Sequence, residues 1–324
     1  MRFGRWQAVI ISSILLANGW FQPGQAQDSK FVGLYREIGG EVVEHEVKKG
    51  ERLPAIAQRY AIRWRVLAKQ NPEVNPERLK PGTKLKIDYT FIIPAELTAG
   101  LVINLPELAL YHFEDGALVR RYALAAGKSD WQTPTGDYKI LNKIRNPTWV
   151  VPPSIQEEME ELGQPVLVRV PPGPNNPLGA FWMATSAPGI GIHATTRPWS
   201  IGHFASHGCI RMLPDEIEEL FNRVSVGTPV KIIYKPVKLA LLRDGRIFLE
   251  VHRDPYRKAP PAAEIVAELL RRQQLENLVA PELVQIAVSE RDGVARDITR
   301  PAPAGQLAEQ LYKGEIQDSG LSRP

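Results

Sequence analysis

The chain has 324 residues, a formal net charge of +4, and a composition that is 44% hydrophobic and 23% charged. This balance is typical of a globular protein, and the length is sufficient for two or three domains of roughly 100–200 residues each. So small a net charge does not indicate a nucleic-acid partner. After residue 26, no segment has the run of about 20 apolar residues that a membrane span requires.

Residues 1–26 have the layout of a secretory signal peptide. Arg2 and Arg5 give a basic start, an apolar run extends from Ala8 to Ala17, and Gly24-Gln25-Ala26 offers small residues for cleavage. The apolar run is shorter than a membrane span, although an uncleaved anchor is the alternative. We expect an exported protein without an integral membrane span after processing. Cleavage removes two positive charges and leaves a formal charge of +2.

Residues 42–90 predict a small domain of a strand, two helices and a strand. Val42 to Val47 reads as a strand, and "LPAIAQRY" and "RVLAKQ" have apolar residues at helical spacing. "NPEVNP" then ends the second helix, and "KPGTKLKI" gives a turn and a closing strand. This frame resembles the LysM domain, a module that binds the glycan of peptidoglycan or chitin. Leu53-Pro54 stands where LysM helices more often begin with Thr or Ser, so a packing platform without glycan binding is the alternative.

Residues 99–235 predict a second, β-rich domain, and residues 236–324 a C-terminal extension. Short extended runs fill the β-rich domain, with a hairpin turn at Glu114-Asp115-Gly116 and one helix that begins near Pro214. The extension has a hairpin turn at Asp244-Gly245, an amphipathic helix in "PAAEIVAELLRRQQLENLV", and a polar tail with the composition of a disordered segment. The expected fold class is α+β, mainly β.

Residues 191–212 hold three of the six histidines and the only cysteine of the chain. In an exported protein a lone cysteine indicates an intermolecular bridge or a free thiol with a chemical role, and a buried inert residue is the alternative. A nucleophilic thiol needs a base nearby, and His193, His203 and His207 are the candidates.

The local pattern suggests how the site is arranged. If Ser206 to Arg211 is extended, His207, Cys209 and Arg211 share one face of the strand. Gly208 then lets a substrate backbone approach closely, and the amides of Gly208 and Cys209 can donate to an oxyanion. Spacing alone does not decide whether His193 or His207 is the base.

Three separated blocks carry a second resemblance: "TPTGDYKI…NPTWVVPPSI", "NNPLGAFWM" and "IH…SHGCIRM". In this order they resemble the L,D-transpeptidases with a YkuD-type, β-sandwich-like catalytic domain, in the periplasmic branch of Gram-negative bacteria. The resemblance implies a nucleophile, a base, a carbonyl that holds the base, backbone support for an oxyanion, and substrate-binding side chains. The nucleophile is then Cys209, and the base is His193, held by the carbonyl of Ala194. His207 and Gly208 give the backbone support, and Arg211 and Ser206 bind substrate.

The resemblance also implies an activity. A thioester forms on the cysteine from a peptidoglycan tetrapeptide stem, D-alanine leaves, and an amine accepts the acyl group without a metal or organic cofactor. The acceptor amine can belong to diaminopimelate, to a lysine of an outer-membrane lipoprotein or to a free D-amino acid. Water in its place would make an L,D-carboxypeptidase. The implied partners are stem peptides and glycan, and the implied location is the periplasm.

Two other classes of function are open from the residues alone. His193, His203, His207 and Cys209 have the ligand types of a zinc site, although glycines and a proline interrupt their spacing. A non-catalytic wall-binding protein, in which the LysM-like domain alone acts, is the other possibility. Papain-like and caspase-like proteases are excluded because their local signatures around the cysteine are absent.

Overall fold

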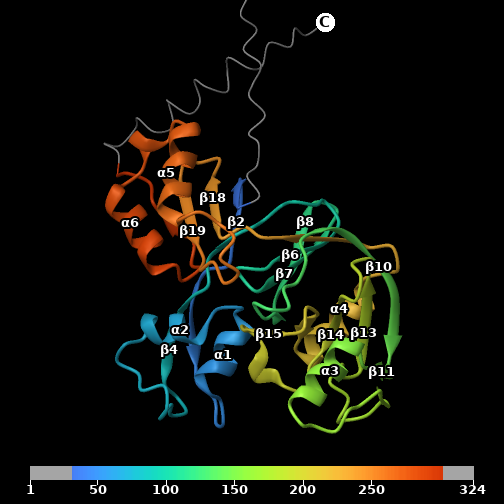
Figure 1. The fold of residues 1–324 in the computed structure, drawn as a ribbon. Coiled ribbons are helices and arrows are strands. Elements are labelled where there is room, and N and C mark those ends of the chain that lie inside the picture. The colour runs from blue at the N-terminus through green and yellow to red at the C-terminus, as the bar shows by residue number, and fades with distance from the viewer. Residues whose placement is uncertain (1–30, 302–324) are drawn as a thin grey trace, which may run out of the picture.

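The computed structural model describes residues 31–301 (Figure 1). The signal peptide expected at 1–26 and the tail expected near the C-terminus lie outside the described residues. Within 31–301, none of the helices combines the length and apolar character needed to cross a membrane.

The strand, two helices and strand expected at 42–90 are present. They are β3 (Val42–Glu46), α1 (Leu53–Arg59), α2 (Trp64–Gln70) and β4 (Lys84–Asp88). β3 and β4 pair antiparallel, and the helices cover one side of the pair. No side chain caps α1, and a proline stands in its first turn, where the missing N–H would have had no helical partner. Leu53, Ile56, Leu67, Leu85 and Ile87 form a fully buried core.

The β-rich domain is built on a sheet of eight strands, in the order β16-β14-β13-β10-β17-β6-β7-β8. In chain order the strands are β6 (Gly100–Asn104), β7 (Ala109–Glu114), β8 (Ala117–Ala123), β10 (Gly136–Arg145), β13 (Phe181–Thr185), β14 (Gly191–Ala194), β16 (Ile210–Met212) and β17 (Pro229–Ile233). β10 pairs with β17 through its first half and with β13 through its second half, with a register shift between Ile140 and Asn142. This long strand therefore joins the two halves of the sheet.

Helix α4 (Pro214–Arg223) follows the sheet's edge strand β16 directly and buries Ile217, Leu220 and Phe221 in the main core. Shorter elements lie around the end of the sheet that contains β14 and β16. They are β9 (Ala126–Gly127), β11 (Trp149–Val150), α3 (Pro153–Glu161), β12 (Arg169–Val170), η1 (Pro198–Ser200) and β15 (Phe204–Ser206). β9 and β15 pair in parallel, β11 and β12 pair antiparallel, and α3 contributes no fully buried side chain.

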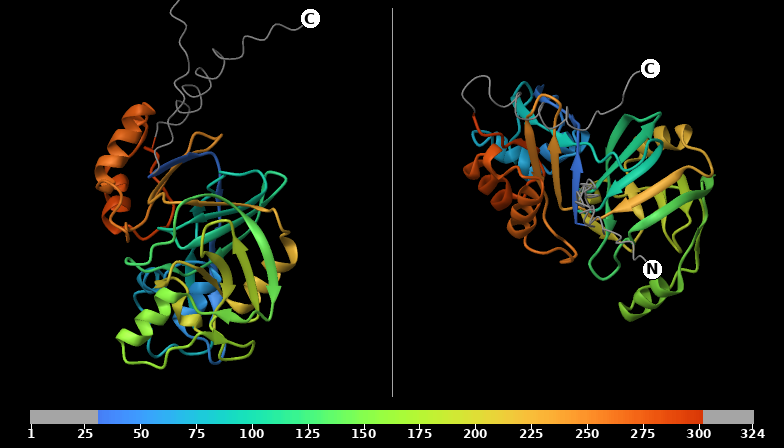
Figure 2. Two further views of the ribbon diagram at one scale, coloured as in Figure 1. Left: turned by 45° about the vertical axis from the view of Figure 1, so that its right-hand side comes forward. Right: turned by 90° about the horizontal axis from the view of Figure 1, so that it is seen from above.

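The C-terminal region forms a second sheet with its own core. The expected hairpin is β18 (Val237–Leu241) with β19 (Ile247–Val251), and the expected helix is α5 (Ala262–Arg272). Three elements were not expected: η2 (Glu276–Leu278), α6 (Pro281–Glu290) and β20 (Arg296–Asp297). Helices α5 and α6 cover the outer face of the sheet (Figure 2).

A segment near the start of the described chain completes this C-terminal sheet. β1 (Val32–Tyr35) pairs in parallel with β18, and the sheet has the order β1-β18-β19-β20. The short strands β2 (Ile38–Gly39) and β5 (Phe91–Ile92) precede and follow the LysM-like module in the sequence, and they pair with each other. The region after residue 235 is therefore more than an appendage, because it takes a strand from the other end of the chain.

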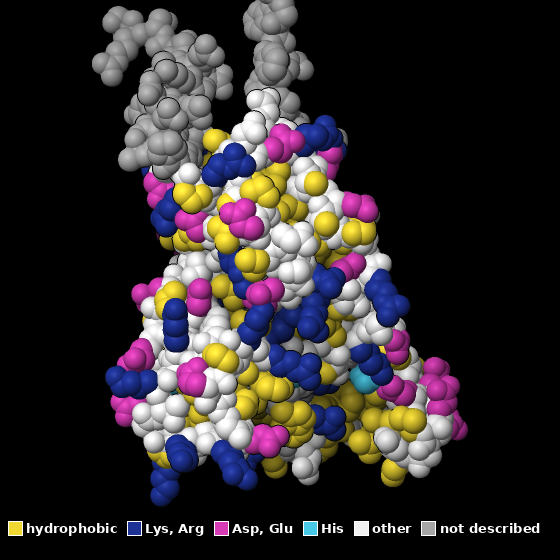
Figure 3. All heavy atoms as spheres, turned by 90° about the vertical axis from the view of Figure 1, so that its left-hand side faces the viewer, with side chains coloured by type: hydrophobic (Ala, Val, Ile, Leu, Met, Phe, Trp, Pro, Cys, Tyr) yellow, Lys and Arg dark blue, Asp and Glu magenta, His cyan; other side chains and the backbone are white. Residues whose placement is uncertain are grey.

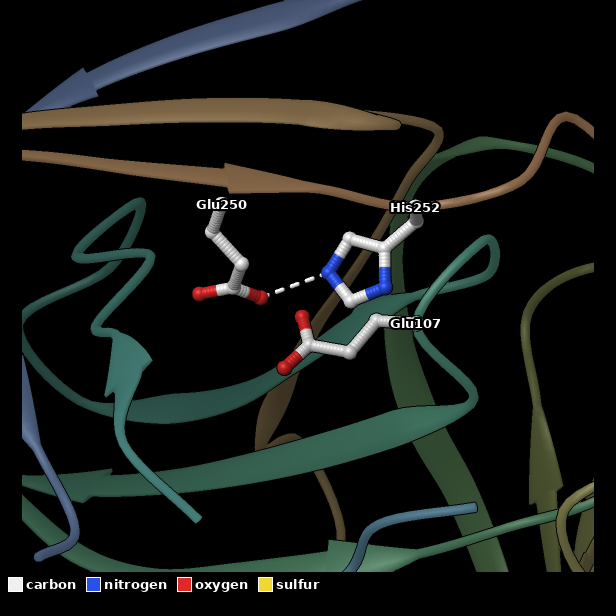
Figure 4. A group of neighbouring side chains, drawn as sticks. All are labelled: Glu107, Glu250 and His252. Carbon is white, nitrogen blue, oxygen red and sulfur yellow. Dashed lines mark hydrogen bonds and ion pairs between the residues drawn. The ribbon is translucent and has the colours of Figure 1, made fainter. Parts of the chain in front are cut away.

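Buried charges join the C-terminal sheet to the eight-stranded sheet. Glu250 of β19 and His252 lie beside Glu107, which comes from the turn between β6 and β7 (Figure 4). The Nζ atom of Lys238 in β18 lies 2.9 Å from Oε2 of Glu107 and 2.8 Å from Oε1 of Glu250, and all three side chains are fully buried. Arg121 of β8 also pairs with Glu107, at 3.0 Å.

These charges stabilise one another. Burial alone raises the pKa of Glu107, but Lys238 and Arg121 outweigh it and hold the pKa below its ordinary value. The negative charges of Glu107 and Glu250 are therefore compensated by residues of the chain itself. The Lys238 ammonium contacts both carboxylates, in the position that a metal ion would need to occupy.

Candidate active site

His193 and Arg211 lie side by side on adjacent parallel strands. β14 and β16 pair so that His193 is opposite Arg211 and Ile192 is opposite Ile210. Ile192 and Ile210 point into the main core, so His193 and Arg211 project from the other face of the sheet. Cys209 stands immediately before β16, two residues before Arg211.

The thiol of Cys209 is half-buried against the turn that leads into β14. Its Sγ atom donates a hydrogen bond to the carbonyl oxygen of Gly189, at 3.5 Å, and accepts one from the amide of Gly191. Burial raises the pKa of the Cys209 thiol, while the Gly191 amide and the positive charge of Arg211 act in the opposite direction and only partly offset it. At neutral pH the resting group is therefore a thiol, which needs a base to become a nucleophile.

His193 has the properties of that base. Burial and the nearby charge of Arg211 lower its pKa to about 4, against the opposing effect of the Ala194 and Leu178 carbonyls. Nδ1 donates a hydrogen bond to the carbonyl oxygen of Ala194 at 2.6 Å, and the Trp182 ring packs against the imidazole. A neutral imidazole with its proton on Nδ1 carries a lone pair on Nε2, which can accept a proton.

Ser206 to Arg211 do not form one extended stretch, which was the condition for His207, Cys209 and Arg211 to share a face. β15 ends at Ser206 and β16 begins at Ile210, and between them the chain bends at Gly208, whose φ is 104°. L-residues rarely adopt this φ, whereas glycine does so at little cost. The bend turns His207 away from the wall formed by Cys209 and Arg211.

His207 instead contacts helix α3 and the segment before β10. Its Nε2 lies 2.5 Å from Oε2 of Glu158, and its ring meets the Trp131 ring edge-on at 5.0 Å between centroids. Lys128 pairs with the other carboxylate oxygen of Glu158, at 2.9 Å. These contacts hold α3 over the loop that carries Cys209, and they place His207 in a supporting position.

Ser206 is part of the loop's internal bonding and does not face a substrate. Its fully buried hydroxyl donates to the carbonyl oxygen of Cys209 at 2.5 Å and accepts from the amide of Gly208 at 3.2 Å. The expectation that Ser206 binds substrate is therefore corrected. The Gly208 amide, expected as an oxyanion donor, is bonded within the loop.

Thr133 and Tyr256 also hold this loop, and the sequence pattern assigned neither of them. The buried Thr133 hydroxyl donates to the carbonyl oxygen of Gly208 at 2.7 Å and accepts from the amide of Gly127 at 3.0 Å. The Tyr256 hydroxyl donates to the Gly127 carbonyl at 2.7 Å. Thr133 lies in the quoted block "TPTGDYKI", so the motif could have pointed to its role. No local pattern marks Tyr256, which follows β19.

The three imidazoles around Cys209 do not converge on a common point, as a zinc site would require. His193 bonds to Ala194, His207 contacts Glu158, and the exposed His203 lies 3.2 Å from the Ile201 carbonyl. Within residues 31–301 the group with metal-ligand geometry is Glu107, Glu250 and His252, where Lys238 already lies.

The raised pKa of Cys209 predicts how its reactivity depends on pH. The thiolate fraction, and with it the rate of alkylation by iodoacetamide, should increase through a midpoint above the ordinary thiol value of 9.0. Arg211→Gln removes a charge that lowers this pKa, so the midpoint should move to still higher pH. Alkylation rates measured by intact mass from pH 6 to pH 11 test both statements. A midpoint near 7 in the wild type would contradict them.

Comparison with known proteins shows where this arrangement belongs. Residues 98–232 match the L,D-transpeptidase catalytic domain of the YkuD type, and residues 45–88 match the LysM domain. The chain is 31% identical to the probable L,D-transpeptidase YcfS of Escherichia coli K12, over 92% of this chain and 96% of that protein. The chain belongs to the L,D-transpeptidase family.

Other relatives cover less of the chain. The probable L,D-transpeptidase YbiS of Escherichia coli K12 is 33% identical over 62% of this chain and 66% of that protein. The catalytic domain of an Enterococcus faecium L,D-transpeptidase, solved by NMR, is 24% identical over 43% of this chain and 99% of that one, with a TM-score of 0.34. The resemblance drawn from the sequence blocks is confirmed, and the protein is a transpeptidase with a YkuD catalytic domain and a LysM domain.

Proposed function

We propose that this transpeptidase acts in the periplasm on peptidoglycan tetrapeptide stems, through a thioester on Cys209. The observation that carries the proposal is the shared face of β14 and β16. His193 and Arg211 project from that face, and the half-buried Cys209 thiol, two residues before Arg211, is near enough for the guanidinium to act on the pKa of both groups. A nucleophile, a base and a carboxylate-binding cation are the groups that acyl transfer from an anionic peptide requires.

In the first half of the reaction, the Cys209 thiol transfers its proton to Nε2 of His193, and Sγ attacks the diaminopimelate carbonyl that is bonded to D-alanine. A C–S bond forms, the C–N bond breaks, and the proton on His193 passes to the leaving amine of D-alanine. In the second half, an acceptor amine attacks the thioester, a new C–N bond forms, and the C–S bond breaks to release Cys209. His193 takes the proton of that amine and returns it to the sulfur.

The surroundings of the pair suit these steps. The bond from His193 Nδ1 to Ala194 fixes the ring so that Nε2 is free to accept the proton. The Arg211 guanidinium stabilises the thiolate as it forms and is placed to bind a substrate carboxylate. For the Gly208 amide to serve an oxyanion, it must exchange its 3.2 Å bond to Ser206 for the substrate oxygen.

The LysM module is held beside this site. The side-chain amide of Gln58 in α1 donates to the carbonyl oxygen of Pro198 at 3.0 Å, and Ala61 packs with Ile201 and Ala125. Pro198 lies in η1, a few residues after His193. We propose that the module binds the glycan, so that stems attached to that glycan are presented to Cys209.

Turnover of a defined donor tests the proposed function. The mature chain is incubated with a synthetic tetrapeptide stem and an excess of an amine acceptor, and products are separated by liquid chromatography and mass spectrometry. We expect free D-alanine together with the tripeptide joined to the acceptor. Cys209→Ala should give neither. Tripeptide alone would indicate the L,D-carboxypeptidase, and equal products from Cys209→Ala would contradict a cysteine mechanism.

The cellular acceptor can be identified separately. An outer-membrane lipoprotein lysine and a second diaminopimelate leave different products in the wall. Muropeptide analysis of cells with and without the gene should show either lipoprotein remnants or L,D-crosslinks that depend on Cys209. A wall unchanged by loss of the gene would contradict a role in transpeptidation there.

The brace formed by Thr133 should matter to catalysis although it does not face substrate. Thr133→Val keeps the shape of the side chain but removes two buried hydrogen bonds. One is donated to the Gly208 carbonyl, and the other is accepted from the Gly127 amide. We expect kcat/KM for D-alanine release to fall by about 10- to 100-fold, because the loop that positions Sγ loosens. The loss of stability should be only about 1–3 kcal/mol. Kinetics and urea unfolding of the same samples test this, and an unchanged kcat/KM would show that the brace is dispensable.

A further inference from the structure

The match to the YkuD catalytic domain ends at residue 232, but a side chain from beyond it enters that domain. Tyr256 follows β19, in the C-terminal region, and its buried ring belongs to the main core of the eight-stranded sheet. The ring stacks on Tyr234 at 5.5 Å between centroids and meets Phe204 of β15 edge-on at 5.3 Å. In the space-filling view the C-terminal region, at the top, and the rest of the described chain form one continuous body (Figure 3). The C-terminal region is therefore packed against the catalytic domain.

Hydrogen bonds hold the segment that carries Tyr256 in place. The Tyr256 amide donates to the Tyr234 hydroxyl at 2.9 Å, and that hydroxyl donates to the carboxylate of Asp254. The same carboxylate accepts the backbone amides of Lys258 and Ala259, at 3.1 and 2.9 Å. The side chain of Tyr256 therefore reaches the catalytic domain from a fixed backbone.

The Tyr256 hydroxyl makes two hydrogen bonds to the segment that packs against the cysteine loop. It donates to the carbonyl oxygen of Gly127 at 2.7 Å and accepts from the amide of Thr133 at 3.3 Å. The Thr133 hydroxyl in turn donates to the Gly208 carbonyl at 2.7 Å. A Cβ atom on Gly127 would lie 2.0 Å from the Trp131 carbonyl oxygen and 3.0 Å from Cα of Gly208. The two backbones are therefore in close contact, and glycine is required where they meet.

The carbonyl that Thr133 holds belongs to the peptide group that links Gly208 to Cys209. A peptide group is planar and trans, so its N–H points away from its C=O. Fixing the Gly208 carbonyl therefore fixes the direction of the Cys209 amide, which is one of the two amides expected to stabilise an oxyanion. The other, the Gly208 amide, is bonded to Ser206. The direction of the amide on the nucleophile's own residue is thus set through Thr133.

We propose that Tyr256 is a positioning residue for acyl transfer, which acts through Thr133 to aim the Cys209 amide at the oxyanion formed when the sulfur attacks. The inference rests on the proposed thioester mechanism. It extends the catalytic unit of this chain beyond residue 232, into the C-terminal region. The hydroxyl of Tyr256 is the group that matters, because it makes both hydrogen bonds to the segment that holds the loop.

Tyr256→Phe tests the inference, because it keeps the ring contacts and removes the hydroxyl. We expect kcat for D-alanine release to fall by about tenfold with little change in KM, since the oxyanion is absent from the bound substrate. Acylation by a carbapenem should slow by a similar factor, because opening of the lactam also passes through an oxyanion. Alkylation of Cys209 by iodoacetamide forms no oxyanion, so its rate and its pH dependence should keep their wild-type values.

Two further variants serve as comparisons. Tyr122→Phe removes another buried tyrosine hydroxyl from the same core, 3.3 Å from Glu219, and should keep the wild-type kcat. The double variant Tyr256→Phe with Thr133→Val should be no slower than Thr133→Val alone, because both substitutions act on the same contacts to Gly208.

Three results would overturn the inference. The first is a wild-type kcat in Tyr256→Phe. The second is faster alkylation of that variant with a midpoint at lower pH, which would show that the loop has loosened and exposed the sulfur. The third is a double variant in which the two losses simply multiply. A wild type that neither releases D-alanine from a tetrapeptide stem nor reacts with the carbapenem would overturn the proposed function, and the inference with it.

Discussion

Replacing Lys238 by Met is expected to lower the free energy of unfolding by about 3–5 kcal/mol, because two buried carboxylates then lose their shared counter-charge. Lys238 contacts Glu107 and Glu250 at 2.9 and 2.8 Å, and its Nζ also donates to the Ile92 carbonyl at 2.8 Å. The substitution keeps the length of the side chain and removes the charge. Urea unfolding followed by circular dichroism measures the difference.

The control is a lysine at the surface. Lys231→Met breaks longer and more exposed ion pairs, at 3.8 Å to Glu96 and 3.6 Å to Asp137, and should change stability by no more than about 1 kcal/mol. If Lys238→Met does not fold, the double variant Lys238→Met with Glu250→Gln should recover part of the loss, because it removes one of the uncompensated charges. Equal effects of Lys238→Met and Lys231→Met would contradict a structural role for the buried network.

Replacing His193 by Ala is expected to reduce kcat/KM for D-alanine release by about 100- to 10,000-fold, the usual contribution of a positioned general base. The thiol pKa is raised by burial, so without His193 little thiolate forms at neutral pH. Part of the lost rate should return at alkaline pH, where hydroxide replaces the base. Steady-state kinetics from pH 6 to pH 10 measure both effects.

Two other histidines serve as comparisons. His203→Ala should behave as the wild type, because this side chain is exposed and its hydrogen bond goes to the nearby backbone carbonyl of Ile201. His207→Ala should have an intermediate effect, through loss of the contact with Glu158. If His207→Ala abolished turnover while His193→Ala retained it, the assignment of the base would be wrong.

Much of the fold follows from local patterns. Helix α4 begins where Pro214 and the acidic Asp215 and Glu216 favour a helix start, and the LysM frame has its core at the expected apolar positions. Helix α6 was missed, although Pro281 followed by Leu283, Val284 and Ala287 has helical spacing and was a usable signal. These features depend on residues close together in the chain.

Long-range pairing could not be predicted in the same way. β1 is only four residues long, and its partner β18 lies some two hundred residues later, so no local pattern joins them. The same holds for Tyr256, whose hydroxyl reaches Gly127 across the fold. The sequence therefore left the role of the C-terminal extension open, whereas in the structure its Tyr256 contacts Gly127 and Thr133, and Thr133 holds Gly208.

The site was predicted in part. Cys209, His193, Ala194 and Arg211 came from motif blocks, and the structure places His193 opposite Arg211 on adjacent strands, with Cys209 directly before the second of them. The shared face of His207, Cys209 and Arg211 depended on an extended stretch through Gly208. Gly208 has a φ of 104° instead, so this condition is not met. A glycine within an extended motif is a reason to expect such a bend.

The central claim is that the sulfur of Cys209, activated by His193, accepts the acyl group. The most direct measurement is the intact mass of the protein after incubation with a carbapenem, whose strained lactam carbonyl acylates an attacking thiolate as its C–N bond opens. We predict one adduct per chain, mapped to Cys209 by proteolysis, absent from Cys209→Ala and formed much more slowly by His193→Ala. A wild type that stays unmodified, or that carries the adduct at another residue, would contradict the mechanism.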